Sequence, residues 1–150
     1  MPDAAVPTFR LQTGAALPHA VSQQIVPVKL ESPALQVMTD LTQVRAATTS
    51  PETSLRQAEQ VMIYQGVRML FVVNAMPTVA GLITSTDLHG DDALRVAHER
   101  GLRYDDLCVG DVMTQASALD AIDFSAMAMA TVRQVIATLK RHGHNHLIVV

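Results

Sequence analysis

The sequence predicts an α/β fold of two tandem β-α-β-β-α repeats that pack around a pseudo-twofold axis, with the second repeat incomplete at its C-terminus. Three features occur twice along the chain: a Val-Met-Thr tripeptide, an amphipathic helix closed by glycine, and a run of four apolar residues. From the helix onward both copies keep one constant spacing. The tripeptides are residues 37–39 and 112–114, the closing glycines are Gly66 and Gly143, and the apolar runs are residues 70–73 and 147–150.

Length and composition favour a small globular protein. The 150 residues suit one compact domain, or two half-size repeats that share a core. Hydrophobic residues make up 49% of the chain and aromatic residues only 3%, so the core should be aliphatic. The formal net charge is −3 and no run of Lys or Arg occurs, which argues against a nucleic-acid-binding surface.

The cysteine and the N-terminal region indicate the compartment. Cys108 is the single cysteine and sits in an apolar stretch, so we expect a buried thiol rather than a reactive one. Residues 1–31 are interrupted by prolines and contain neither a secretory signal nor a membrane span. A soluble cytoplasmic protein with no membrane association is therefore predicted.

The first repeat should begin after an extended arm over residues 1–31. Ser32 is placed to cap a short helix, with Pro33 at its first position. This helix should end near residues 39–40, and a short strand is predicted over 44–47. Thr53 or Ser54 then caps the next helix.

The remainder of the first repeat follows from apolar patterning. Residues after the cap have helical spacing up to Gly66, and a continuous apolar strand follows. A turn separates it from a second strand, and a connecting helix buries Leu94 and Ala97 and closes at Gly101. The predicted ranges are strand 69–73, turn 74–77, strand 79–83 and helix 91–100.

The second repeat should contain a helix over residues 131–142, with Val132, Val135, Ile136 and Leu139 as its apolar stripe. The strand at 147–150 should be buried beside the sheet of the first repeat. A counterpart of residues 74–88 is missing from this copy. The predicted organisation is an arm at 1–31, a first repeat with connecting helix at 32–103, and a second repeat at 104–150.

The repeated unit with Val-Met-Thr at the head of each copy resembles the cystathionine β-synthase (CBS) domain family, whose members usually occur in tandem pairs. The first copy carries the resemblance most fully, and the likeness spans roughly residues 33–150. Two positions depart from the family, since Phe71 stands where proline is common and Asn74 where aspartate is common. The matching segments are residues 37–39, 54–62, 66–73 and 81–88.

The segment from Gly81 to Asp87 leaves a strand and enters a helix, where free backbone N–H groups favour a phosphate. Thr84 and Thr86 can donate hydroxyl hydrogen bonds to phosphate oxygens. Asp87 offers two acceptor oxygens that suit the two hydroxyls of a ribose. The resemblance implies the same roles for this Thr-x-x-Asp motif. Simple helix capping by these residues is the alternative explanation.

The resemblance also implies an apolar slot for adenine between the early strand of a repeat and the strand before the motif. Thr48 and Met69 would line this slot, and Arg68 would face the phosphate. The expected ligand is AMP, ADP, ATP or another adenosine derivative, and no catalytic cofactor is expected.

Other clusters are better explained structurally. His142, His144 and His146 alternate, which could suggest a metal site, but Gly143 at a helix end breaks the regular backbone that a shared face would need. We therefore expect no metal, and His146 could instead face a phosphate in a second cleft. No nucleophile elbow, phosphate-binding glycine loop or Cys-x-x-Cys pair is present, so no enzyme is predicted.

The sequence therefore predicts a regulatory module that senses an adenine nucleotide and passes the signal to a protein partner or to its own copy. A structural dimerisation module with degenerate clefts and no ligand is the alternative. We expect a homodimer, because residues 126–130 and the following helix expose Ala, Met and Val.

Overall fold

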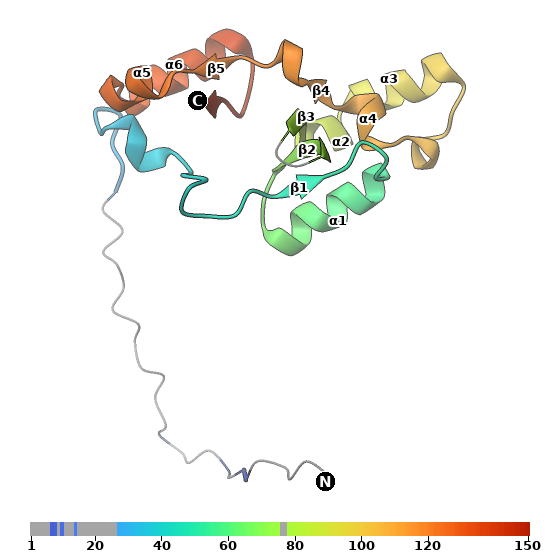
Figure 1. Ribbon diagram of the computed structural model, residues 1–150, viewed down its shortest axis with the longest axis horizontal. Coiled ribbons are helices and arrows are strands. Elements are labelled where there is room, and N and C mark those ends of the chain that lie inside the picture. Colours follow the sequence, from blue (N-terminus) through green and yellow to red (C-terminus); the bar gives the residue numbers. More distant parts are fainter. Residues whose placement is uncertain (1–6, 9, 11–13, 15–26, 76–77) are drawn as a thin grey trace.

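The computed structural model describes residues 7, 8, 10, 14, 27–75 and 78–150 (Figure 1). Most of the predicted N-terminal arm, and part of the predicted turn at 74–77, lie outside the described residues. Among the residues described, no helix is both long and apolar enough to cross a membrane.

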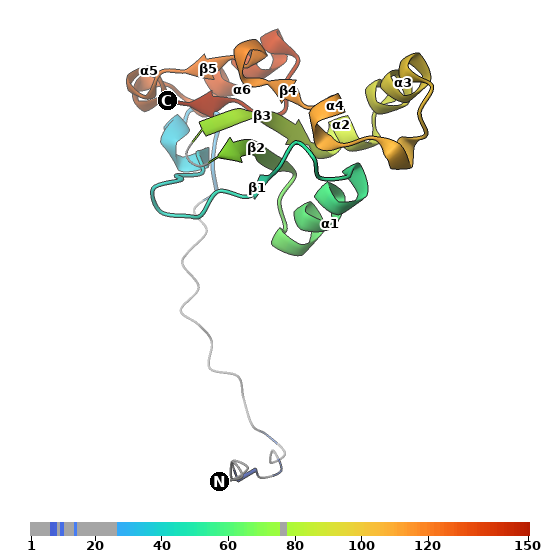
Figure 2. The same ribbon diagram turned by 45° about the vertical axis from the view of Figure 1, so that its right-hand side comes forward.

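A four-stranded sheet forms the centre of the first repeat (Figure 2). Its order is β1-β2-β3-β4, where β1 pairs with β2 in parallel and the other pairs are antiparallel. The edge strand β4 belongs to the second half of the chain, so the sheet joins the two repeats. The strands are β1 (Thr48–Thr49), β2 (Met69–Ala75), β3 (Thr78–Thr84) and β4 (Thr114–Gln115).

Helices cover this sheet on the side of α1 and extend away from it through α3 (Figure 1). The 3-10 helix η1 and the short helix α4 each end at the valine of the Val-Met-Thr tripeptide in their repeat. The helices are η1 (Ala34–Val37), α1 (Leu55–Gln65), α2 (Ser85–His89), α3 (Asp91–Arg100), η2 (Tyr104–Asp106) and α4 (Val109–Val112).

The second repeat follows the same plan. Its parallel pair of strands, β5 and β6, aligns Ala121 with Ile148, as β1 and β2 align Thr48 with Phe71. Helix α6 lies between these strands in the chain, as α1 lies between β1 and β2. The elements are η3 (Ala116–Ala118), β5 (Ala121–Ile122), α5 (Phe124–Met129), α6 (Val132–His142) and β6 (Ile148–Val149).

The equivalent helices α1 and α6 begin and end in the same way. Ser54 and Thr131 each form a capping box with the glutamine three residues later, which satisfies backbone N–H groups at the helix start. Gly66 and Gly143 close the helices with φ of 66° and 67°, a left-handed conformation that glycine adopts without strain. The predicted cap at Ser54 and the closing glycines are confirmed.

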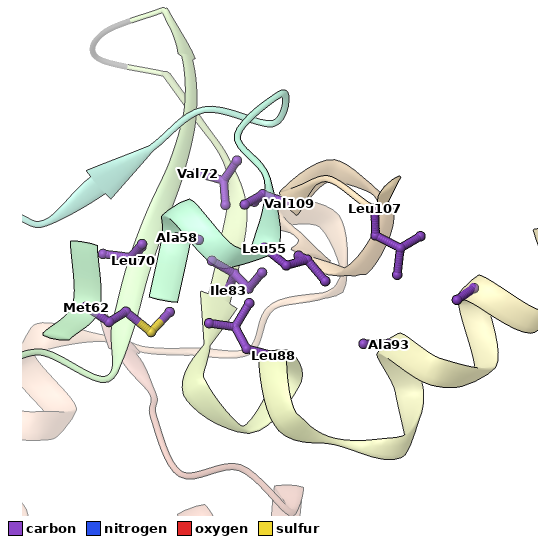
Figure 3. Close-up of a cluster of buried hydrophobic side chains, with 11 residues drawn as sticks. Leu55, Ala58, Met62, Leu70, Val72, Ile83, Leu88, Ala93, Leu107 and Val109 are labelled. Atoms are coloured by element: carbon purple, nitrogen blue, oxygen red, sulfur yellow. The ribbon is translucent and has the colours of Figure 1, made fainter. Parts of the chain in front are cut away.

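The core is aliphatic, as composition predicted (Figure 3). Leu55 and Met62 of α1 pack on Leu70 and Ile83 of the sheet, and all four are at most 4% exposed. Burial of each such side chain contributes about 1.5–3 kcal/mol. Leu107 and Val109 join the same cluster from the second half of the chain, so the two halves share one core.

Backbone bridges cross between the repeats. Ser54, at the start of α1, pairs with Cys108, and Thr131, at the start of α6, pairs with Pro33. Cys108 and Pro33 each stand four residues before the valine of their Val-Met-Thr tripeptide. The segment before each tripeptide therefore binds the helix of the other repeat, which is the exchange that a pseudo-twofold axis requires.

Four expectations about local structure were wrong. The first strand is Thr48–Thr49 rather than 44–47, because its ladder starts where Phe71 N–H donates to the Ala47 carbonyl.

The second and third wrong expectations concern Ser32 and Leu94. Ser32 does not cap η1. Pro33 is the N-cap residue, without a side-chain bond, and the Ser32 hydroxyl accepts from the Lys29 N–H instead. Leu94 is 59% exposed, because α3 faces the core with Ala93 and Ala97.

The fourth wrong expectation concerns the strand at residues 147–150, which was predicted to be buried beside the sheet of the first repeat. It is half-buried rather than buried, and Val150 is 73% exposed. Strand β6 pairs with β5, while the edge of the first sheet is taken by β4. The stripe of α6 is also only partly buried, since Val132 is 9% and Ile136 is 36% exposed.

Candidate functional site

The corner between β3 and α2 holds the Thr-x-x-Asp motif. Thr84 ends β3, and α2 starts at the next residue. One carboxylate oxygen of Asp87, Oδ2, accepts from the Thr84 N–H at 2.7 Å and from the Thr84 hydroxyl at 2.8 Å. The Asp87 N–H donates to Thr84 Oγ1 at 3.3 Å. Among the described residues Asp87 Oδ1 has no hydrogen-bond partner, so it can accept from a ligand.

This corner forms one wall of a cleft between the repeats. The cleft is small, with a cavity volume of about 120 Å³, and it is open to solvent. The first sheet contributes Leu82 and the motif, and the second repeat contributes the loop between α6 and β6. The lining residues are Leu82, Thr84, Thr86, Asp87, Thr114, Leu119, Asp120, Gly143, His144, Asn145, His146 and Ile148.

His146 lies in this cleft, and its Nδ1 is buried without a hydrogen-bond partner in the described structure. Burial lowers the pKa of the imidazole, since removal from water disfavours the charged form. The charge of Asp87 opposes this shift and that of Arg68 adds to it. His146 therefore lies within electrostatic range of the motif and offers the cleft an unsatisfied polar atom.

Asp120 stands just before β5 and is held by the end of α6. The His142 Nδ1 lies 3.0 Å from Asp120 Oδ2, and the His144 Nε2 lies 3.8 Å from the same oxygen. The two imidazole rings are parallel, with centroids 6.4 Å apart. His142 and His144 thus fix Asp120 at the edge of the cleft.

The three remaining predicted site residues do not line this cleft. Arg68 is exposed and lines a neighbouring hollow with Glu59, Ser85 and His89. Its carbonyl accepts from the Ser85 N–H at 2.9 Å, which ties it to the start of α2. Thr48 and Met69 are half-buried in the sheet, where Thr48 pairs with Phe71 and Met69 with Thr84.

Sequence reasoning brought together Thr84, Thr86 and Asp87 but missed most of the opposite wall. Leu119 and Asp120 lie in a segment with no motif, and Thr114 was recognised only as the end of the second Val-Met-Thr tripeptide. The pairing of β3 with β4 brings this part of the chain to the cleft. The loop at 143–146 carried a usable signal, because the constant spacing between the copies aligns it with residues 66–69.

Two other features bear on metal binding and thiol reactivity. Within the described part of the chain, no group of three or more His, Cys, Asp or Glu side chains is arranged to hold a metal ion. Cys108 is half-buried rather than buried, and its thiol donates to Asp111 Oδ2 at 3.2 Å. Burial and the neighbouring Asp111 raise the pKa of the thiol, which favours its unreactive protonated form.

Comparison with known proteins supports the repeat. Residues 36–90 match the family model of the CBS domain. No curated protein sequence matches the chain. An uncharacterized conserved protein from Pyrococcus horikoshii has a similar structure, with 23% identity and a TM-score of 0.58, over 82% of this chain and 81% of that one.

Two similar structures contain ligands. CBSX2 in complex with AMP has 18% identity and a TM-score of 0.53, over 79% of this chain and 82% of that one. The CBS domain pair of protein MJ0100, in complex with 5′-methylthioadenosine and S-adenosyl-L-methionine, has 16% identity and a TM-score of 0.52, over 83% and 82%. At these identities the likeness establishes the fold.

Proposed function

We propose that the chain is a member of the CBS-domain proteins and a regulatory module that binds an adenosine derivative in the cleft between its repeats. The match of residues 36–90 to the CBS domain model and the fold of a CBS domain pair support this proposal. The observation that carries this proposal is the cleft itself. It brings Asp87 of the first repeat to His146 and Asp120 of the second. A ligand there would touch both repeats.

The geometry of Asp87 supports a role in holding a ribose. Its Oδ2 is occupied by Thr84, while Oδ1 is free to accept from a ribose hydroxyl. Thr86 is exposed on the first turn of α2 and can donate to a phosphate or a 5′ group. Leu82, Leu119 and Ile148 offer apolar surface for an adenine ring.

We also propose roles for Arg68, Thr48 and Met69, although these residues do not line the cleft. Arg68 would act from the neighbouring hollow on a phosphate that extends out of the cleft. Thr48 and Met69 would act through the sheet that carries the cleft wall. The division into residues 1–31, 32–103 and 104–150 is also proposed, as is a cytoplasmic setting.

Regulation follows if the ligand favours one packing of the repeats over another, because a ligand shifts an equilibrium only by its differential affinity. A non-catalytic role is part of this proposal. Calorimetric titration of the full chain with AMP tests the proposal. Binding in the micromolar range supports it, and no binding of either AMP or 5′-methylthioadenosine at millimolar concentration contradicts it.

The alternative is a structural module without a ligand. One observation favours it: the Thr84–Asp87 capping box alone accounts for both side chains. A thermal-shift screen with adenosine derivatives separates the two functions, because a ligand that binds only the folded state raises the Tm. No shift with AMP, ADP, ATP, NAD or S-adenosylmethionine would favour the structural role.

We also propose that the chain forms a homodimer. Helix α5 and the helix after it present large apolar side chains to solvent, with Phe124 51%, Met129 87% and Ile136 36% exposed. Apolar groups gathered on a small protein commonly mark an interface. Sedimentation equilibrium at tens of micromolar should give a dimer, and Met129→Lys should shift it toward monomer. A monomer for the unaltered chain would contradict this.

A further inference from the structure

Among the described residues, the cleft is lined by acidic side chains and by no basic side chain other than histidine. Two carboxylates, Asp87 and Asp120, line it from the two repeats, together with His144 and His146. No lysine or arginine is among its lining residues in the part of the chain that the structure describes. A site built for a polyphosphate would place cations here, because a triphosphate needs charge-assisted hydrogen bonds.

Arg68 supplies only limited compensation. Its charge reaches His146, but the side chain is exposed and lines the neighbouring hollow rather than the cleft. One guanidinium can offset a single negative charge. It cannot offset two carboxylates and a triphosphate together.

Asp120 adds a negative charge that the motif does not require. Its side chain is 53% exposed, and both histidines beside it contact the same oxygen, Oδ2. In the described structure Asp120 makes no contact with Asp87 or with the motif. Asp120 and the loop at 143–146 line the same cleft as Asp87. If Asp87 holds the ribose, a 5′ group that extends toward this loop would lie beside Asp120.

We infer that the cleft selects adenosine derivatives whose 5′ group is neutral or cationic over those that carry a polyphosphate, and that Asp120 is the residue that enforces this choice. The inference rests on the proposed function, since it assumes an adenosine ligand in this cleft. Each carboxylate that faces a phosphate weakens binding by about three- to tenfold at a partly solvated site.

Calorimetry of the full chain with four compounds tests this inference. 5′-Methylthioadenosine is neutral, S-adenosylmethionine carries a sulfonium cation, AMP carries one phosphate and ATP carries three. The unaltered chain should bind the first two at least about tenfold more tightly than ATP, with AMP between them. Equal or tighter binding of ATP would overturn the inference.

Variants of Asp120 test whether its charge causes the selectivity against polyphosphates. Asp120→Asn should raise the affinity for ATP relative to that for 5′-methylthioadenosine about three- to tenfold. Asp120→Glu keeps the charge and should keep the discrimination, which separates charge from folding. Asp92→Asn on α3 removes an exposed carboxylate that does not line the cleft and should change neither affinity.

The outcomes distinguish the two proposals. If none of the four compounds binds, the proposed function fails and this inference fails with it. If 5′-methylthioadenosine binds but Asp120→Asn leaves the ATP affinity unchanged, the proposed function stands and only the role of Asp120 is overturned.

Discussion

Thr84 and Asp87 hold each other through three hydrogen bonds, all within the first turn after β3. Asp87 Oδ2 accepts from both the Thr84 N–H and the Thr84 hydroxyl, and the Asp87 N–H donates back to Thr84 Oγ1. The pair fixes the carboxylate at the edge of the cleft. It also stabilises the start of α2, so structural and ligand-binding roles must be separated by experiment.

Asp87→Ala should weaken binding of an adenosine ligand about ten- to a hundredfold, because it removes charge-assisted hydrogen bonds to the ribose. It should also destabilise the fold by about 1 kcal/mol through loss of the cap. Calorimetry well below the Tm of the variant measures the affinity alone.

The matched control is Asp123→Ala. Asp123 caps α5 by accepting from the N–H groups of Ser125 and Ala126, and it does not line the cleft. This variant should lose similar stability but keep the affinity. Equal affinity in both variants would show that Asp87 only caps.

Thr84→Ala should weaken binding less than Asp87→Ala. Its hydroxyl donates to Asp87, so the change frees the carboxylate without removing it. A neutral hydrogen bond contributes about 0.5–1.5 kcal/mol, which corresponds to roughly two- to tenfold in affinity. Thr84→Ser keeps the hydroxyl and should restore binding. A greater loss than that of Asp87→Ala, measured by the same titration, would contradict the assigned roles.

Gly81→Ala should destabilise the protein by about 2 kcal/mol or more. A Cβ at this position would lie 2.2 Å from the Thr114 carbonyl oxygen, where β3 pairs with β4. The clash falls on backbone, so it cannot be relieved by a side-chain rotation. Chemical denaturation measures the free energy of unfolding.

Gly110→Ala is the comparison, since its added Cβ would lie 3.3 Å from the Pro51 Cβ and carbonyl oxygen and should cost less. If both variants are as stable as the unaltered chain, the close approach of β4 to Gly81 is wrong.

His146 should make stability depend on pH. Its pKa in the folded state is lowered from the ordinary value of 6.5 by burial, so the unfolded state binds protons more readily than the folded state. The full stability is present above pH 6.5 and falls as the pH decreases through the unfolded value toward the folded one. His146→Asn should flatten this part of the Tm profile between about pH 7.5 and 5.

The control for pH is His98→Asn, because His98 is an exposed residue on α3 that does not line the cleft. This variant should keep the slope of the unaltered chain. A slope unchanged by His146→Asn would assign the pH dependence to other groups.

Local signals predicted the helices well. Ser54, Gly66 and the range of the connecting helix followed from caps and closing glycines, which act within a few residues. The sequence did not predict correctly which face of α3 is buried. Leu94 and Ala97 satisfy helical spacing, but so do Ala93 and Ala97, and only packing decides which pair is buried.

The candidate site was predictable only on one side. Thr84, Thr86 and Asp87 are close in sequence, and the repeat made their pattern recognisable. Asp120 and Thr114 reach the cleft because short strands pair across the repeats, and a two-residue strand such as β4 leaves almost no sequence pattern. Arg68 was assigned to the cleft by analogy, but it lies just before β2 and lines the neighbouring hollow instead.

The most direct test of the central claim is an NMR titration of the isotope-labelled full chain with 5′-methylthioadenosine. We expect saturable shifts in the amides of two segments far apart in sequence, residues 81–88 and 143–148, while those of α3 stay in place. Shifts confined to one repeat, or located away from both segments, would contradict a ligand site between the repeats.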